Sequence, residues 1–152
     1  MTKVYLTDGT VYDHLELEAA WNRHRTILIS DGMGQSSDDP EPDTGWAQQA
    51  SRIVNLLDYQ QRGFRRRQIL EAFRDGRRRG AYWSIHSQND DYDPKDPIHA
   101  LELAEIPTRL RALPSDTQEQ LINCGYVMCD ASVRKHLSGP DAPESLPYPR
   151  IV

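Results

Sequence analysis

The sequence predicts an α/β fold with few strands and predominantly helical content. Residues 26–30 (Thr-Ile-Leu-Ile-Ser) form an apolar run, which is typical of a strand covered on both faces. A helical pattern over residues 14–25 precedes this run, and an alternating segment at residues 3–7 precedes that helix. Strand, helix and strand in this order are typical of a βαβ unit. Longer helical patterns occupy most of the remaining chain.

The first element, residues 3–7 (Lys-Val-Tyr-Leu-Thr), is predicted as a strand because polar and apolar residues alternate. Asp8-Gly9 ends it in a tight turn, since glycine takes the positive φ that such a turn needs. The helix predicted over 14–25 has apolar residues on one side and three cations near its end, where they suit the helix dipole.

The middle of the chain contains a polar loop over residues 31–45 and then one long helix, or two, over residues 46–79. The helix is indicated by a stripe of 3.6-residue period that includes Ile53, Leu57, Gln60 and Phe64. Residues 81–86 (Ala-Tyr-Trp-Ser-Ile-His) are predicted as a further strand.

The C-terminal part is predicted to contain a loop over 87–97 and helices over 99–112 and 115–137. In the last helix the expected apolar face is formed by Leu121, Ile122, Tyr126, Cys129 and Val133. Residues 138–152 contain four prolines and are expected to be an extended tail. The predicted organisation is therefore one domain over residues 1–137 and a proline-rich tail over 138–152.

Composition narrows the class of protein further. A chain of 152 residues fits one domain that buries roughly 70% of its unfolded surface. The net charge of −5 disfavours nucleic acid as a partner. Cys124 and Cys129 point in different directions on a helix, so we expect two packed thiols and a cytoplasmic location. The sequence contains no signal peptide pattern and no apolar run of about 18 residues, so no membrane span is expected.

Asp8 is the candidate catalytic residue. A carboxylate at the end of a strand, followed by a glycine turn, is held at the edge of a sheet, where α/β active sites lie. It can there orient a serine hydroxyl and accept its proton. The alternative is that Asp8-Gly9 is only a tight turn, which is common without any catalysis.

The segment from Val4 to Leu15 resembles the catalytic-aspartate region of bacterial patatin-like phospholipases, whose pattern is D-G-[GA]-x-x-[DE]-N. Arg-Thr-Ile-Leu-Ile-Ser-Asp, Ala-Tyr-Trp, Glu-Ile-Pro-Thr-Arg-Leu and Leu-Ile-Asn-x-Gly-Tyr also resemble this family, so the similarity covers about residues 3–137. The resemblance implies the C-terminal portion of a patatin-like sheet, with Asp8 as the aspartate of a Ser-Asp dyad. Three positions depart from the family: Thr10 replaces Gly or Ala, His14 replaces the usual Asn, and Glu16 replaces a frequent Gly.

The serine motif of that family, G-x-S-x-G, occurs nowhere in the 152 residues. The resemblance therefore implies half of a lipid acyl hydrolase, which would act on a lipid ester only when an upstream segment or a separate chain supplies the serine. It implies no cofactor and no metal, and we expect negligible activity from the chain alone. The alternative is a non-catalytic truncated remnant that binds a partner or self-associates through an uncovered sheet edge.

The sequence also contains clusters of arginine, acidic, histidine and serine residues that could have a function. Residues 62–79 contain eight arginines against two acids. This indicates either a solvated helix face that pairs with the acidic loops at 38–43 and 90–96 or a surface that contacts phospholipid headgroups, which are favoured over nucleic acid. Asp31-Gly32-Met33-Gly34 is interpreted as a strand-to-loop turn, with a site-lining loop or second acid as the alternative. The five histidines lack metal-ligand spacing, and neither Ser36, Ser37 nor Ser84 has an elbow motif around it.

Overall fold

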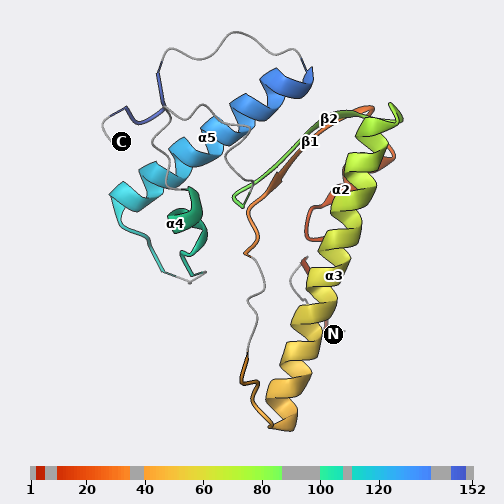
Figure 1. Cartoon of the computed structure of the whole chain (residues 1–152), viewed down its shortest axis with the longest axis vertical. Helices are drawn as coiled ribbons and strands as arrows, with labels where there is room; N and C mark the ends of the chain where they lie inside the picture. Colours follow the sequence, from red (N-terminus) through yellow and green to blue (C-terminus); the bar gives the residue numbers. More distant parts are fainter. Residues whose placement is uncertain are drawn as a thin grey trace. The chain divides into compact units, whose positions relative to one another are not determined.

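The computed structural model describes residues 3–5, 10–34, 40–86, 100–107, 111–137 and 145–149. Its elements in chain order are α1 (Thr10–Asp13), α2 (Leu17–Trp21), β1 (Thr26–Asp31), α3 (Trp46–Arg74), β2 (Arg79–Ser84), α4 (Ala100–Ala104) and α5 (Ser115–Leu137) (Figure 1). The mixed and mainly helical α/β class is thereby confirmed. The chain divides into two compact units, Met1–Ile27 with Gln35–Arg79 (unit 1) and Leu28–Gly34 with Gly80–Val152 (unit 2).

The two described strands, β1 and β2, pair in parallel. The backbone N–H of Arg79 donates to the carbonyl of Arg25 at 3.0 Å, and that of Ile85 donates to the carbonyl of Asp31 at 3.2 Å. Both bonds keep the same register, as expected for a parallel pair. Because α3 lies between the strands in the sequence, the order is strand, helix, strand. The predictions of strands at 26–30 and 81–86 are confirmed, the second with its start shifted to Arg79.

The burial of β1 differs from the prediction. Ile27 and Ile29 are buried, whereas Leu28 between them is 52% exposed. The apolar run predicted a strand covered on both faces, and that prediction was wrong. Successive side chains of a strand point to opposite faces, so one face of β1 is covered and the other is open at Leu28.

The N-terminal elements also differ from the prediction. Of the helix expected over 14–25 only α2 forms, and the short α1 lies before this range. Between α1 and α2, Glu16 takes the left-handed conformation (φ 48°, ψ 29°). A left-handed residue cannot continue a right-handed helix, so the helical pattern is interrupted there. Lys3–Tyr5, the described part of the expected first strand, belongs to no strand; residues 6 and 7 lie outside the described residues.

The long helix α3 is one helix rather than two and continues through Gly63. It ends at Arg74, and Gly76, two residues later, has a φ of 69°, the left-handed conformation that favours glycine. At this end the N–H of Gly76 donates to the carbonyl of Phe73 at 3.2 Å and that of Arg78 to Ala72 at 3.0 Å. The buried apolar side chains of unit 1 are Leu17, Ile27, Ile69 and Ala72.

The core of unit 2 lies between β2, α4 and α5, where α4 packs against α5. Its buried members are Ala81, Trp83, Leu103, Cys124 and Met128. The bounds of α5 match the predicted helix over 115–137. The predicted apolar face is only partly correct, because Leu121 and Cys129 pack against the core whereas Ile122 and Tyr126 are 47% and 39% exposed. The buried residues of α5 are instead Asn123, Cys124, Val127, Met128 and Ser132. The helix predicted over 99–112 is the shorter α4, and residues 99 and 108–110 lie outside the described residues.

The described part of the tail, residues 145–149, is held on α5 by one buried amide. Asn123 is 2% exposed, and its Nδ2 donates to the carbonyl of Tyr148 at 2.9 Å while its Oδ1 accepts the N–H of Tyr148 at 3.0 Å. The side chain thus pairs with the main chain of Tyr148 as a neighbouring strand would. The tail over these residues is docked on unit 2.

The two cysteines are free thiols. Burial raises the pKa of Cys124, and burial together with the neighbouring Asp130 carboxylate raises the pKa of Cys129. Neither thiol therefore has the lowered pKa of a reactive cysteine. Among the described helices, none combines the length and the apolar character needed to cross a bilayer.

Candidate functional site

Asp8 and Gly9, the predicted site, lie outside the described residues. Directly after them α1 starts at Thr10, Glu16 takes the left-handed conformation, and α2 follows. The segment from Thr10 to Trp21 therefore contains two very short helices.

Asp13 connects these two helices. It is 8% exposed, its carbonyl accepts the N–H of Glu16 at 2.9 Å, and its Oδ2 accepts the N–H of Glu18 at 2.7 Å. A carboxylate that accepts an N–H in the first turn of a helix typically stabilises it by about 1 kcal/mol. Asp13 is also the acidic position of the pattern D-G-[GA]-x-x-[DE]-N. Its role in this chain is to hold α2 against the end of α1.

Glu16 adopts a conformation that normally belongs to glycine. Its φ of 48° costs a residue with a Cβ about 1–2 kcal/mol. Glu16 is one of the three departures from the patatin-like pattern, which frequently has glycine at this position.

Tyr12 and Glu18 lie on the exposed side of the same segment. The hydroxyl of Tyr12 donates to Oε2 of Glu18 at 2.7 Å, and this hydrogen bond, followed by the charge of Glu18, raises the pKa of Tyr12. The contact joins α1 to α2 a second time. It gives the segment a defined shape without placing an activated group on it.

A second acidic position lies at the carboxyl end of β1. Oδ2 of Asp31 accepts the hydroxyl of Tyr82 at 2.6 Å, and Oδ1 accepts the N–H of Met33 at 3.1 Å. Both carboxylate oxygens are therefore occupied by contacts that fix the strand end and the loop after it. This geometry matches the strand-to-loop turn expected for Asp31-Gly32-Met33-Gly34.

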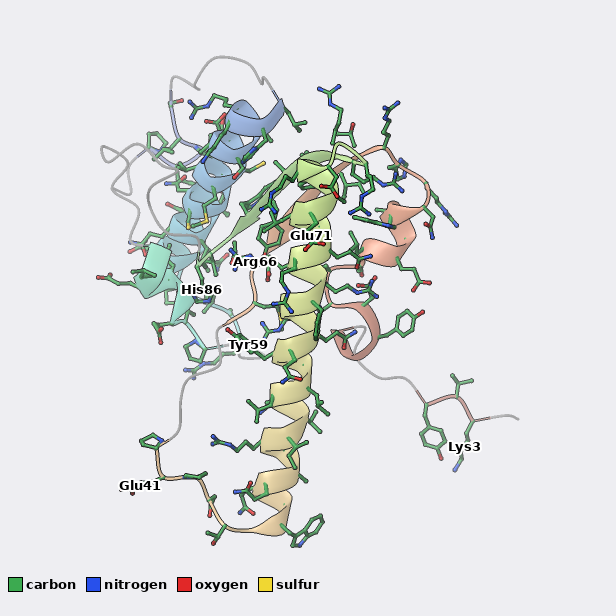
Figure 2. The ribbon with its side chains drawn as sticks, turned by 45° about the vertical axis from the view of Figure 1, so that its right-hand side comes forward. Lys3, Glu41, Tyr59, Arg66, Glu71 and His86 are labelled. Atoms are coloured by element: carbon green, nitrogen blue, oxygen red, sulfur yellow. The ribbon has the colours of Figure 1, made fainter. Side chains whose placement is uncertain are left out.

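Ser84 and His86 follow at the end of β2, where Figure 2 labels His86. Ser84 is 8% exposed, and its Oγ accepts the backbone N–H of His86 at 3.3 Å. This contact uses the main chain of His86 and closes a turn. It differs from the hydroxyl-to-imidazole contact of a nucleophile and its base. Among the described residues, no group of histidine, cysteine and acidic side chains could hold a metal ion.

The arginines of residues 62–79 make mainly local contacts. Arg62 pairs with Asp58 at 3.2 Å, and Arg77 pairs with Asp75 at 3.1 Å. Arg78 donates to the carbonyl of Trp21 at 2.8 Å and stacks over its ring. The expected pairing with the loop at 90–96 lies outside the described residues.

The sequence did not indicate Asn123 as a structural side chain. A buried polar side chain on the inner face of α5 needs a hydrogen-bond partner. For Asn123 this partner is the main chain of Tyr148, and the sequence pattern does not indicate a contact with a residue 25 positions away.

Comparison with known proteins identifies no relative: no family model, no curated protein and no solved structure matches this chain.

Proposed function

We propose that these residues form the C-terminal part of a patatin-like acyl hydrolase, in which Asp8 is the aspartate of a Ser-Asp dyad. The substrate class is a lipid ester, such as a phospholipid. The serine comes from an upstream segment or a separate chain. The setting is the cytoplasm, with peripheral contact at a lipid surface.

The observation that carries this proposal is the conformation of Glu16. The resemblance assigns a frequent glycine to this position, and the backbone there has a φ of 48°. Asp13, at the acidic position of the same pattern, caps α2. Asp13 belongs to the quoted pattern and Glu16 lies two residues after it, so these two observations support the proposal at and next to the motif.

The proposed chemistry is acyl transfer to serine. Asp8 accepts the proton of the serine hydroxyl as its oxygen attacks the ester carbonyl, and the alcohol leaves with that proton. Water then attacks the carbonyl of the acyl-serine and gives a proton to Asp8, and Asp8 returns that proton to the serine oxygen as the bond to the acyl group breaks and the acid leaves. This reaction needs a nucleophile that the present residues lack, so the chain alone is expected to be inactive.

The test is complementation with a segment that carries G-x-S-x-G, taken from the coding region directly upstream. The chain alone should hydrolyse p-nitrophenyl esters at no more than the buffer rate, and the completed protein should hydrolyse them measurably. Asp8→Ala should remove that activity by a factor of about 10³ or more, as for other residues that act as one catalytic unit. Glu71→Gln, a change at an exposed carboxylate of α3 outside every segment that resembles the family, is the matched control.

Two results would contradict the proposal. Activity of the completed protein that survives Asp8→Ala would remove the dyad role from Asp8. Ester turnover by the isolated chain that depends on Asp8 would show that no second segment is needed.

A non-catalytic, self-associating protein is the second candidate function. It is favoured by one observation, the large apolar side chains exposed on α3. Trp46 is 84% exposed and Phe64 is 65% exposed.

A further inference from the structure

The N-terminal half of α3 has an apolar stripe that the described residues of unit 1 leave exposed. Its four large members, Trp46, Ile53, Leu57 and Phe64, are 84%, 55%, 60% and 65% exposed. The buried residues of this helix, Ile69 and Ala72, lie near its C-terminal end. In both views the N-terminal half of α3 extends beyond α1 and α2 (Figure 1, Figure 2).

The stripe has the spacing of a coiled-coil seam. Its positions alternate in steps of four and three residues: Trp46, Ala50, Ile53, Leu57, Gln60 and Phe64. The positions that flank the seam are all uncharged: Ala47, Gln49, Val54, Leu56, Gln61 and Gly63. The charged residues between the ends of the stripe, Arg52, Asp58 and Arg62, lie outside this surface.

This distribution of charge favours a protein over a lipid surface. A helix that lies in a membrane interface carries Lys or Arg beside its apolar face, where the long side chains reach the headgroups. Here the seam is flanked by alanine, valine, leucine and glutamine. Such flanks let a second helix approach without repulsion between like charges.

A second copy of the same helix fits this surface when it runs antiparallel. The seam has two alternating sets of positions, one that contains Trp46 and Ile53 and one that contains Leu57 and Phe64. In an antiparallel pair, each position of one set faces a position of the other set on the second helix. With the pair centred at Asn55, Trp46 faces Phe64 of the partner subunit, and Ile53 faces Leu57 of the partner subunit. Ala50 faces Gln60 of the partner subunit, so that a small side chain meets a long one.

The charges at the ends of the stripe agree with the antiparallel direction. Arg67 continues the seam beyond Phe64 and stacks on its ring at 4.7 Å. Asp43 is exposed and lies three residues before Trp46, in the non-helical segment that leads into α3. Glu41, labelled in Figure 2, lies on the same segment before α3. In the antiparallel register Arg67 meets Asp43 of the partner subunit, whereas in a parallel register Arg67 would meet its own copy.

From these features we propose that two copies of this chain associate through antiparallel pairing of α3 along Trp46, Ile53, Leu57 and Phe64. The interface is short, roughly 27 Å for 18 helical steps. The association is therefore a concentration-dependent equilibrium between monomer and dimer. It does not depend on the catalytic proposal, since it uses no residue of the dyad.

The test is sedimentation velocity of the full chain over a wide range of concentration. The chain should change from monomer to dimer as its concentration rises, and Leu57→Glu should raise the dimer dissociation constant by on the order of 100-fold or more, because each dimer buries two copies of Leu57. Ile122→Glu is the matched control, since it adds the same charge at a half-exposed apolar residue of α5. Circular dichroism checks that both variants keep the helical content.

A charge exchange tests the direction of the pair. Arg67→Asp and Asp43→Arg should each weaken the dimer, and the double variant should restore most of the loss. Strengthening of the dimer by Arg67→Gln, which in a parallel pair would remove the repulsion between the two Arg67 side chains, would indicate a parallel pair and overturn the register.

Two further results would overturn the proposal. One is a chain that stays monomeric at every concentration, or a dimer that Leu57→Glu leaves unchanged. The other is a monomeric chain that binds vesicles of phosphatidylglycerol and phosphatidylcholine through this stripe, which would assign the surface to lipid.

Discussion

The helices α3 and α5 use similar amphipathic sequences in opposite ways. Over its 29 residues α3 buries only Ile69 and Ala72, whereas the 23 residues of α5 bury five side chains spread over several turns. The large apolar residues of α3 are concentrated in its first half and are exposed there. An apolar stripe therefore indicates a surface that can be covered. It does not indicate whether the same chain or another molecule covers that surface.

The inner face of α5 also contains two different kinds of interaction. Cys124 and Met128 belong to an apolar cluster with Trp83 of β2 and Leu103 of α4. Asn123, next to Cys124, is a buried amide whose two polar atoms pair with the main chain of Tyr148. Shortening an apolar side chain should therefore remove packing from the core, whereas shortening Asn123 should remove hydrogen bonds to the tail.

The largest expected difference between the two helices is in the cost of shortening an apolar side chain. Met128 is 4% exposed, so Met128→Ala should lower the free energy of unfolding by about 2–4 kcal/mol. Leu57 is 60% exposed, so Leu57→Ala should change it by less than about 0.5 kcal/mol at protein concentrations where the chain is monomeric. Urea denaturation followed by circular dichroism measures both. Equal losses would show that the stripe on α3 is covered within the monomer.

The next effect concerns the polar contact of α5. Asn123→Ala leaves the N–H and carbonyl of Tyr148 without their partner, which should lower the free energy of unfolding by about 1–3 kcal/mol. Hydrogen exchange at residues 145–149 should become faster at the same time. Tyr148→Ala is the control, because the hydrogen bonds use only the main chain of this residue and should survive. A tail that exchanges equally fast in the parent and in Asn123→Ala would contradict the contact.

The sequence predicted the parts of this fold where one local signal dominates. The apolar run at 26–30 and the long pattern over 115–137 gave β1 and α5 with nearly correct bounds. The prediction failed where the backbone departs from its local preference. Glu16 is a residue with a Cβ in a left-handed conformation, and nothing in its chemistry indicates the break between α1 and α2.

The inner face of α5 could not be predicted for a related reason. Periodicity placed Ile122 and Tyr126 inside because they are apolar, but the tertiary contacts with β2, α4 and the tail select the adjacent face, which contains Asn123 and Ser132. For the candidate site, the sequence supplies Asp8 through a motif alone. The structure adds the capping role of Asp13 and the conformation of Glu16, which lie after the turn.

The smallest expected effect tests what the two helices have in common. Gly63 in α3 and Gly125 in α5 each lie inside a helix, where glycine costs about 0.5–1 kcal/mol relative to alanine. A Cβ at Gly63 would meet only Nη1 of Arg67 at 3.8 Å, and one at Gly125 would meet nothing within 4 Å. Gly63→Ala and Gly125→Ala should therefore each raise the free energy of unfolding by about 0.5–1 kcal/mol.

Gly76→Ala is the opposing control, because its φ of 69° is strained for any residue with a Cβ. It should lower the free energy of unfolding by about 1–2 kcal/mol even though no atom lies within 4 Å of the new Cβ. The free energy of unfolding of all three variants is measured by urea denaturation at protein concentrations where the chain is monomeric. A loss at Gly63→Ala together with a gain at Gly125→Ala would mean that α3 needs flexibility at Gly63, and that the two helices differ in their backbone as well as in what covers them.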